Sequence, residues 1–250
     1  MSLPIKIKKF LLEQNSNLIH LESVESTMKE IKKHIGDKNI CLIADEQKEG
    51  IGRRGSQWVS PKGNIYLSFL LEYNLLIEDH FLFTAVAANS IMLCLNDYIN
   101  ENIYIKWPND IIVNGSKIAG IMTEIVEHNG IKYVIIGIGI NVETSPKLSD
   151  YKTCCVNNFN SKLMYEEFLL NFFQTFFSEY AMIVNNEHNN IINKFRNNMN
   201  DLGKKITILL PNGKKEIVFL KNLNSDGSLL VEKEGKQESL FSARIIDDFN

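Results

Sequence analysis

Two Asn-Gly pairs, Asn114-Gly115 and Asn129-Gly130, constrain the fold of this chain more than any other feature of its sequence. Each pair lies between runs rich in β-branched and apolar residues. Asn-Gly is favoured in the tight turn of a β-hairpin because both of its residues accept positive φ. The pairs therefore predict consecutive antiparallel strands, which we place at residues 103–107, 111–113, 118–126 and 132–142.

Helical patterns flank this meander on both sides. Thr27 to Glu30 fits a capping box at a helix start, and Phe81 to Ile99 is apolar on nearly every face, which predicts a buried helix. A Phe-rich amphipathic helix is predicted at 163–184, with a helical continuation at 191–199. Short strands are predicted at 40–44 and 65–71, before the meander.

The pattern changes at about Asp201. Short strand-like runs then alternate with turn signals such as Asp226-Gly227 and Glu234-Gly235. We expect a domain boundary near Gly203, with a first domain at 1–202 and a small β-barrel at 203–250. The predicted fold class is α+β: a mixed sheet with helices on one face, followed by this barrel.

Composition and charge exclude several classes of protein. The net charge of −3 argues against a general nucleic-acid binder. No apolar run approaches the ~20 residues of a membrane span, and the first ten residues resemble no secretory signal. The four cysteines form no Cys-x-x-Cys pair and the five histidines form no ligand-spaced pair. We therefore expect a soluble, cytoplasmic protein without a protein-built metal site.

A glycine-arginine loop, Gly50-Ile51-Gly52-Arg53-Arg54-Gly55, precedes Trp58. The spacing formally matches a dinucleotide fingerprint, but residues 56–63 form no helix pattern, so a Rossmann site is disfavoured. Glycine supplies mobility, and guanidiniums bind phosphate oxygens as planar forks. The loop is therefore interpreted as one that folds over an anionic ligand. The alternative is a surface loop with two solvated arginines.

Lys106 lies in a predicted strand and is followed by Trp107-Pro108-Asn109-Asp110. A lysine facing inward from a strand needs an anion, because burying an unpaired charge is very costly. Asp110 could orient or deprotonate an attacking amine. A solvent-facing lysine beside a packing tryptophan, followed by a turn aspartate, is the alternative.

Two further motifs place small residues beside polar ones. Lys117 follows a hairpin turn and precedes Ala119-Gly120, which lets another group pack closely on the strand. Gly137 and Gly139 interrupt a buried strand, and glycine in a strand indicates a close neighbour, either a ligand or backbone. Asn141 could then bind a ribose or a phosphate.

Together these segments resemble the biotin protein ligases. Members of that family form biotinyl-adenylate from biotin and ATP, then pass biotin to one lysine of a carboxylase carrier domain. The resemblance runs from about Leu21 to the end of the chain. Its most specific part is Lys106 to Asp110 followed by Lys117 to Gly120. It implies a class II synthetase-like ligase core and an SH3-like C-terminal barrel.

The resemblance also implies residue roles. Ser26, Thr27 and Gln47 would bind the ureido head of biotin. Lys117 would bind the biotin carboxylate and then the α-phosphate, while Arg53 and Lys106 would hold the ATP phosphates. Trp58 would close over the adenine, Asn141 would lie on the nucleotide side, and Asp110 would meet the incoming lysine. The remaining implied binding positions are Gly50, Ile51, Gly52, Arg54, Gly55, Asn109, Gly120, Ile121 and Gly137. Mg²⁺ is expected with ATP, held mostly by phosphates and water.

Three alternatives stay open. A lipoate-type ligase shares the core fold, but its arginine-then-glycine signature with a histidine is missing. A non-catalytic biotin or nucleotide binder would not need the cationic set. A bifunctional repressor would need a winged helix-turn-helix, and only about 20 residues precede Ser23. We expect a ligase-only protein that binds no nucleic acid. The oligomeric state, a homodimer included, stays open.

The loop departs from the usual family pattern Gly-Arg-Gly-Arg-Arg-Gly-Arg, because Ile51 and Ser56 replace its first and last arginines. We expect the loop to close less tightly, so that the reactive adenylate leaks faster than in relatives with the full pattern. An Ile51→Arg variant should release the adenylate more slowly in a gel-filtration assay. An unchanged release rate would contradict this role for the missing arginines.

Overall fold

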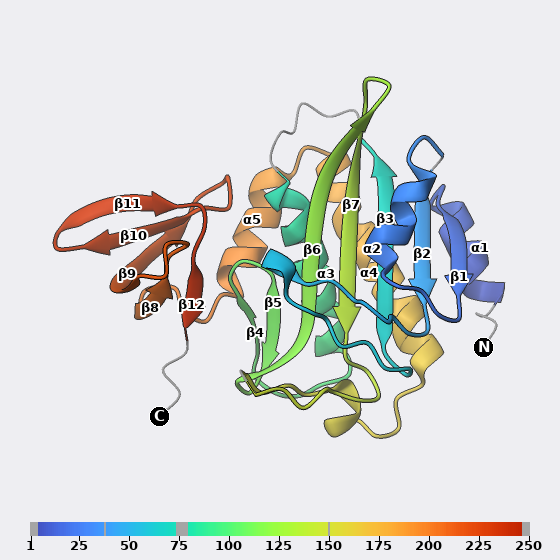
Figure 1. Cartoon of the computed structure of the whole chain (residues 1–250), viewed down its shortest axis with the longest axis horizontal. Helices are drawn as coiled ribbons and strands as arrows, with labels where there is room; N and C mark the ends of the chain where they lie inside the picture. The colour runs from blue at the N-terminus through green and yellow to red at the C-terminus, as the bar shows by residue number, and fades with distance from the viewer. Residues whose placement is uncertain (1–4, 38, 74–79, 150, 247–250) are drawn as a thin grey trace.

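The computed structural model describes residues 5–37, 39–73, 80–149 and 151–246. Its centre is a seven-stranded mixed sheet in the order β1-β2-β3-β7-β6-β5-β4 (Figure 1). The strands are β1 Asn17–Leu21, β2 Ile40–Ala44, β3 Ile65–Glu72, β4 Ile103–Lys106, β5 Asp110–Val113, β6 Ser116–His128 and β7 Ile131–Ile140. β1 pairs with β2 in parallel, and the other neighbouring strands pair antiparallel.

The predicted meander is confirmed. Asn114 and Gly115 have φ of 47° and 77°, and Asn129 and Gly130 have φ of 52° and 77°. Both pairs thus have positive φ at their two central residues, as a tight hairpin turn requires. The second turn joins β6 to β7, which pair from Ala119 with Ile140 to the turn itself.

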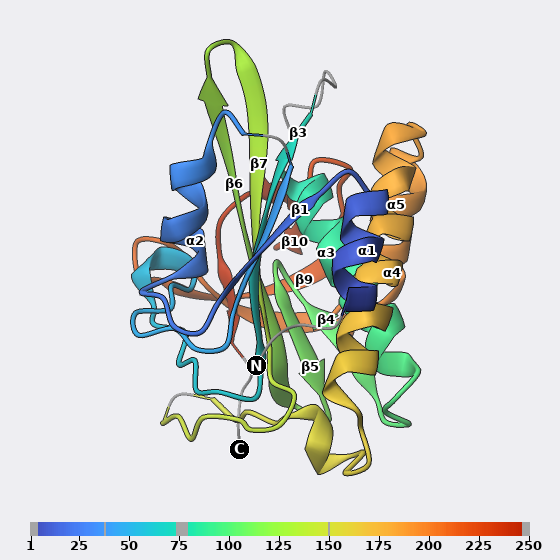
Figure 2. The same cartoon turned by 90° about the vertical axis from the view of Figure 1, so that its right-hand side faces the viewer.

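Helices cover the two faces of the sheet unequally (Figure 2). One face carries α1 Ile5–Glu13, α3 Phe81–Asn96, α4 Tyr165–Val184 and α5 His188–Asn197. The short helix α2, Thr27–Glu30, and the 3₁₀ turn Ile31–His34 lie on the opposite face. The prediction that the helices pack on one face of the sheet is therefore correct for these four helices and wrong for α2. No helix within the described ranges combines the length and apolarity needed to cross a bilayer.

Strand alternation decides what each face of the sheet carries. On β3, Leu67 and Phe69 belong to the large core under the helices, whereas Leu70 joins a smaller core around α2. Phe69 stacks on Phe176 of α4 with ring centroids 4.2 Å apart. Ser68 takes the opposite parity to Phe69, and its hydroxyl bonds to Thr27 of α2. Polar groups on β3 therefore face α2.

Two N-terminal elements were not predicted. α1 carries three lysines and only Ile7 and Leu11 are its buried residues, so its apolar stripe is narrow. β1 is only partly buried along its length, and no hairpin turn announces it because it pairs with β2 in parallel. The capping box at Thr27 is also wrong. Ser26 is the N-cap residue without a side-chain cap bond, and the Thr27 hydroxyl bonds to Gln47 instead.

The C-terminal segment forms a second, five-stranded antiparallel sheet in the order β11-β10-β9-β8-β12. Its strands are β8 Lys205–Leu209, β9 Lys215–Leu223, β10 Leu229–Lys233, β11 Lys236–Leu240 and β12 Arg244–Ile246. β11 and β12 are the edge strands of this sheet, so its closure into an SH3-like barrel stays a prediction. The domain boundary near Gly203 also stays a prediction.

Hydrogen bonds from Trp107 and Arg196 help to attach this sheet to the rest of the molecule. Trp107 Nε1 donates to the carbonyl of Gly227 at 2.9 Å, and Arg196 of α5 donates to the carbonyl of Leu223 at 2.7 Å. The ring of Phe81 packs so closely on Gly227 that a Cβ there would overlap it. The turn before β10 is therefore fixed against the first sheet.

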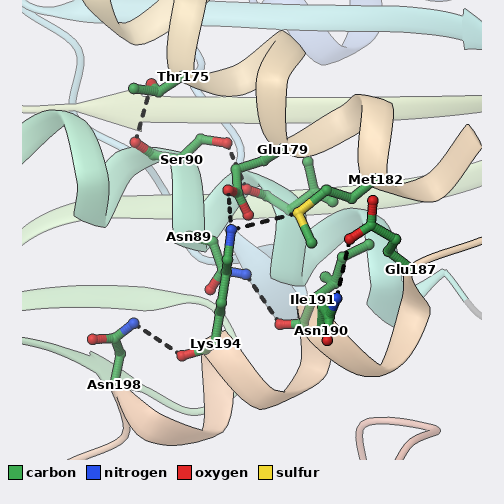
Figure 3. Close-up of polar contacts among 11 residues, drawn as sticks. Asn89, Ser90, Thr175, Glu179, Met182, Glu187, Asn190, Ile191, Lys194 and Asn198 are labelled. Atoms are coloured by element: carbon green, nitrogen blue, oxygen red, sulfur yellow. Dashed lines mark hydrogen bonds and ion pairs between the residues drawn. The ribbon is translucent and has the colours of Figure 1, made fainter. Parts of the chain in front are cut away.

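An ion pair with a buried carboxylate and a partly exposed ammonium joins α5 to α4 (Figure 3). Lys194 Nζ lies 2.5 Å from Glu179 Oε1 and 3.4 Å from Met182 Sδ. The Glu179 side chain is 4% exposed, and its second oxygen has no hydrogen-bond partner among the described residues. Lys194 is therefore the cation that makes this buried carboxylate tolerable.

Replacing Lys194 by Met should lower the free energy of unfolding by about 2 kcal/mol, because Glu179 keeps a buried charge without its cation. We expect less than for a fully buried pair because the Lys194 side chain is 44% exposed. Urea unfolding measures the change. Lys9→Met, which breaks the exposed Lys9–Glu13 pair, is the matched control and should cost less than about 0.5 kcal/mol. Equal losses in the two variants would contradict the assignment.

Candidate functional site

A cavity of about 550 Å³ lies between the glycine-arginine loop, the β4–β7 part of the sheet and the C-terminal sheet. It brings together most of the residues singled out in the sequence. Those lining it are Thr27, Gln47, Ile51, Gly52, Arg53, Arg54, Gly55, Trp58, Lys106, Asn109, Asp110, Lys117, Gly120, Ile121 and Gly137. Ser26, Gly50 and Asn141 are not among its lining residues.

The glycines of β6 and β7 make room for the indole of Trp58. A Cβ on Gly139 would lie 2.5 Å from indole atoms, and one on Gly120 would lie 2.8 Å from the ring. The sequence predicted a ligand or backbone close to Gly137 and Gly139. The close neighbour is instead a side chain, that of Trp58 at Gly139 and that of Met28 at Gly137. The Nε1 of Trp58 is buried beside Gly139 and has no hydrogen-bond partner among the described residues.

Lys117 occupies the centre of the site. Its Nζ forms a 2.7 Å ion pair with Asp110, and the two side chains are 15% and 29% exposed. The same ammonium lies 5.1 Å from the Trp58 ring centroid and 5.4 Å from that of Tyr151. Aromatic faces and one carboxylate thus surround it. An anionic ligand can take the place of Asp110 without leaving the lysine unpaired.

The two loop arginines have different partners. Arg53 Nη1 donates to Asn109 Oδ1 at 3.2 Å, and Asn109 Nδ2 donates to the carbonyl of Ile121 at 2.6 Å. Burial lowers the pKa of Arg53, nearby Arg54 lowers it further, and Asp110 partly offsets both. Arg54 has φ of 55° and reaches Ser242 Oγ at 2.7 Å, which joins the loop to the C-terminal sheet.

Two cationic residues at the cavity escaped the sequence analysis. Lys152 comes from the segment before Cys154, and Arg244 begins β12. With Arg53, Arg54, Lys106 and Lys117 they line a cavity in which Asp110 is the only carboxylate among the described lining residues. No local pattern marks either residue, since only the packing of distant segments brings them here. The excess of positive charge suits a polyanionic ligand.

The end of the cavity nearest α2 is uncharged and polar. Gln47 Oε1 accepts hydrogen bonds from the backbone N–H of Thr27 at 2.8 Å and from its hydroxyl at 3.1 Å. Met28 also lines this end of the cavity, and its thioether packs against Gly137. Ser26 lies next to it, 1% exposed, and its Oγ has no partner among the described residues.

Asn141 has a structural position in this molecule. It is 2% exposed, and its Nδ2 donates to the carbonyl of Cys154 at 3.0 Å. The neighbouring backbone of Lys117 bonds to both Lys152 and Cys154. Asn141 therefore holds the segment that carries Tyr151 and Lys152 over the cavity. Its Oδ1 has no hydrogen-bond partner among the described residues, and its predicted nucleotide contact stays a prediction.

Part of this chain is similar to a known protein family. A protein-family model described as "Biotin/lipoate A/B protein ligase family" matches residues 20–141, which carry most of the cavity lining. The matched residues make up just under half of the chain, so the match shows a similarity to this family over that region. The residues that carried the resemblance in the sequence lie inside the matched range.

Curated proteins are also similar to part of this chain. The bifunctional ligase/repressor BirA of Bacillus subtilis is 34% identical over 128 residues, which are 50% of this chain and 39% of that protein. A biotin--[acetyl-CoA-carboxylase] ligase of Paracoccus denitrificans is 37% identical over 42% of this chain and 45% of its own length. The matched region therefore spans less than half of these curated relatives.

Solved structures match over nearly the whole chain. A biotin protein ligase from Aquifex aeolicus in complex with biotin and ATP has a TM-score of 0.79 and 25% identity, covering 92% of this chain and 97% of that one. A biotin protein ligase from Leishmania major in complex with biotinyl-5-AMP has a TM-score of 0.60 and 27% identity, with coverages of 90% and 99%.

The packing of Trp58 on its glycine can be tested with two matched variants. Gly139→Ala places a methyl group against the rigid indole, whereas Gly137→Ala meets the flexible thioether of Met28, with the Cβ at 2.5 Å in both. We expect Gly139→Ala to shift the Trp58 fluorescence and Gly137→Ala to leave it nearly unchanged. Equal shifts would show that the indole does not rest on Gly139.

Proposed function

We propose that this protein is an ATP-dependent biotin ligase. It forms biotinyl-5′-AMP from biotin and ATP, then transfers the biotinyl group to a lysine of a biotin carboxyl carrier domain. One observation carries the proposal: a single cavity has an uncharged polar end at Thr27 and Gln47 and a cationic end around Lys117. The first end suits a ureido group and the second suits a carboxylate joined to phosphates.

In the first step the biotin carboxylate oxygen attacks the α-phosphorus of ATP, and the bond to pyrophosphate breaks. Lys117 exchanges Asp110 for the biotin carboxylate and then remains beside the α-phosphate. Arg53 and Lys106 offset the charge that develops on the phosphates. Arg244 and Lys152 line the same cavity and add to this field. This cationic lining would offset the repulsion between the two reacting anions.

In the second step the amine of the carrier lysine attacks the acyl carbon of the mixed anhydride, and AMP leaves. The amine must first lose a proton to become nucleophilic. Asp110 is freed once Lys117 turns to the adenylate, so its carboxylate can orient this amine and accept the proton. The Asp110–Lys117 pair thus links the two steps.

Mg²⁺ fits this site only as a partner of ATP. No group of three His, Cys, Asp or Glu side chains in the described ranges is placed to hold a metal ion. The ion would therefore be held by phosphate oxygens and water, with Asp110 as the neighbouring carboxylate. When bound, it would neutralise charge on the triphosphate.

A lipoate-type ligase is the second candidate, since the matched family model covers both activities. Thr27 and Gln47 favour biotin, because lipoate has no ureido group to bond them. The four cysteines are buried and unpaired, which supports a reduced, cytoplasmic location. An SH3-like C-terminal unit and a homodimer remain part of the proposal.

The proposal is tested with biotin, ATP and a biotin carboxyl carrier domain, read by avidin blot with lipoate as competitor. Lys117→Ala should lower adenylate formation at least about 100-fold, because the carboxylate and α-phosphate lose their shared cation. Lys162→Ala removes an exposed lysine outside the cavity and is the control. Full adenylate formation by Lys117→Ala, or preferential transfer of lipoate, would contradict the biotin ligase.

A further inference from the structure

A continuous chain of hydrogen bonds crosses the floor of the site. Ser68 Oγ donates to Thr27 Oγ1 at 2.9 Å, and Thr27 Oγ1 donates to Gln47 Oε1 at 3.1 Å. Gln47 Nε2 then donates to Ser60 Oγ at 2.9 Å, and Ser60 Oγ donates to the carbonyl of Trp58 at 2.8 Å. It starts at a fully buried serine of β3 and ends on the backbone of the loop.

The direction of this chain is fixed by one backbone group. The N–H of Thr27 can only donate, so the Gln47 atom 2.8 Å from it must be the oxygen Oε1. The other side of the amide is therefore the NH₂ group, which gives one hydrogen to Ser60. Ser60 in turn must give its own hydrogen to Trp58. The second N–H of Gln47 is then available to a ligand in the cavity that Gln47 lines.

The surroundings of Gly50 show how closely packed the hydrogen-bond series is where it reaches the loop. A Cβ at Gly50 would overlap the Trp58 carbonyl oxygen and lie 2.7 Å from Ser60 Oγ and 2.9 Å from Gln47 Nε2. The three polar groups therefore meet directly against the Gly50 α-carbon. The backbone repeats the connection, because Trp58 N donates to the carbonyl of Gly50 at 2.8 Å and Gln47 N to that of Ser60 at 3.2 Å.

Trp58 carries the effect of this chain to the reactive end of the cavity. Its indole rests on Gly139 and lies under the ammonium of Lys117 at 5.1 Å. Ser60 is 6% exposed and is not among the residues that line the cavity, so it cannot itself bind the substrate directly. Ser60 bonds to Gln47 at the polar end and to the backbone of Trp58, whose indole packs on Lys117.

We propose that Ser60 is a positioning residue that couples occupancy of the polar end of the cavity to the placement of Trp58. The inference rests on the proposed function, because the ligand at the polar end is taken to be the ureido head of biotin. A ureido oxygen bound to Gln47 Nε2 fixes the amide that holds Ser60. Ser60 then holds the Trp58 carbonyl, and the indole sets the position of Lys117 for the carboxylate.

The test follows Trp58 emission during a biotin titration of the full chain. The protein has two tryptophans, and subtracting the spectrum of Trp58→Phe removes the contribution of Trp107. Biotin binding is measured separately by equilibrium dialysis. In the wild type, saturating biotin should change Trp58 emission. In Ser60→Ala, biotin should bind about tenfold more weakly, and the emission change should be lost even at saturation.

A matched control separates coupling from a general loss of a buried hydroxyl. Ser90 of α3 is also buried and donates to a backbone carbonyl, that of Val86, at 2.7 Å. Ser90→Ala should keep the biotin-dependent change in Trp58 emission. If Ser60→Ala does not fold, Gly50→Ala is the second variant, since its methyl group separates the same three polar groups.

The outcomes distinguish the two proposals. Loss of the Trp58 response in Ser60→Ala, or in Gly50→Ala, with biotin bound supports the coupling. A Ser60→Ala response equal to the wild type at saturation overturns the coupling and leaves the biotin ligase intact. Absence of biotin binding by the wild-type protein overturns the proposed function, and the coupling with it.

Discussion

The strict alternation of side chains along β3 and β7 is the constraint on which the rest of the molecule depends. One parity supplies Phe69 and the aliphatic residues that pack under α3 and α4. The alternate residues, Ser68, Gly137 and Gly139, face α2 and the cavity. A one-residue slip in pairing would put the glycines in the core and the phenylalanine in the cavity. Stability and binding are therefore set by one register.

The cavity that this register creates carries an excess of positive charge. Six cationic residues line it, and Asp110 is the only negatively charged residue among the described lining residues. Its ion pair with Lys117 gives this largely buried ammonium a partner while no anion is bound. An incoming carboxylate therefore replaces an existing partner and does not have to stabilise a bare charge. Exchange of partners is easier than creation of a new buried pair.

Local sequence predicted what local forces determine. The Asn-Gly turns fix their hairpins through backbone conformation alone, and the apolar runs of β2 and α3 are recognisable because they are buried on every side. Thr27 is an example of a residue whose contacts its local sequence does not predict. Its pattern fits a helix cap, yet its hydroxyl bonds to Gln47, which is 20 residues away.

The residues of the site also fall into those that a local motif identifies and those that only the tertiary packing brings in. The family motifs identified Lys106, Lys117 and the loop arginines, which the fold brings to one cavity. Lys152 and Arg244 could not be found in this way, because each enters the site only through the packing of a distant segment. α1 and β1 were missed for a related reason: β1 pairs in parallel, without a turn to announce it.

The bond from Trp107 to Gly227 has an evolutionary consequence. Trp107 stands between Lys106 and Asp110, both lining the cavity, while Gly227 lies 120 positions later in a turn of the C-terminal sheet. Phe81 closes over the same glycine, so neither its size nor its conformation is free to drift. Lineages that alter the indole, the phenyl ring or this turn must change them in concert. These three distant positions should therefore vary together among descendants of the same ancestral gene.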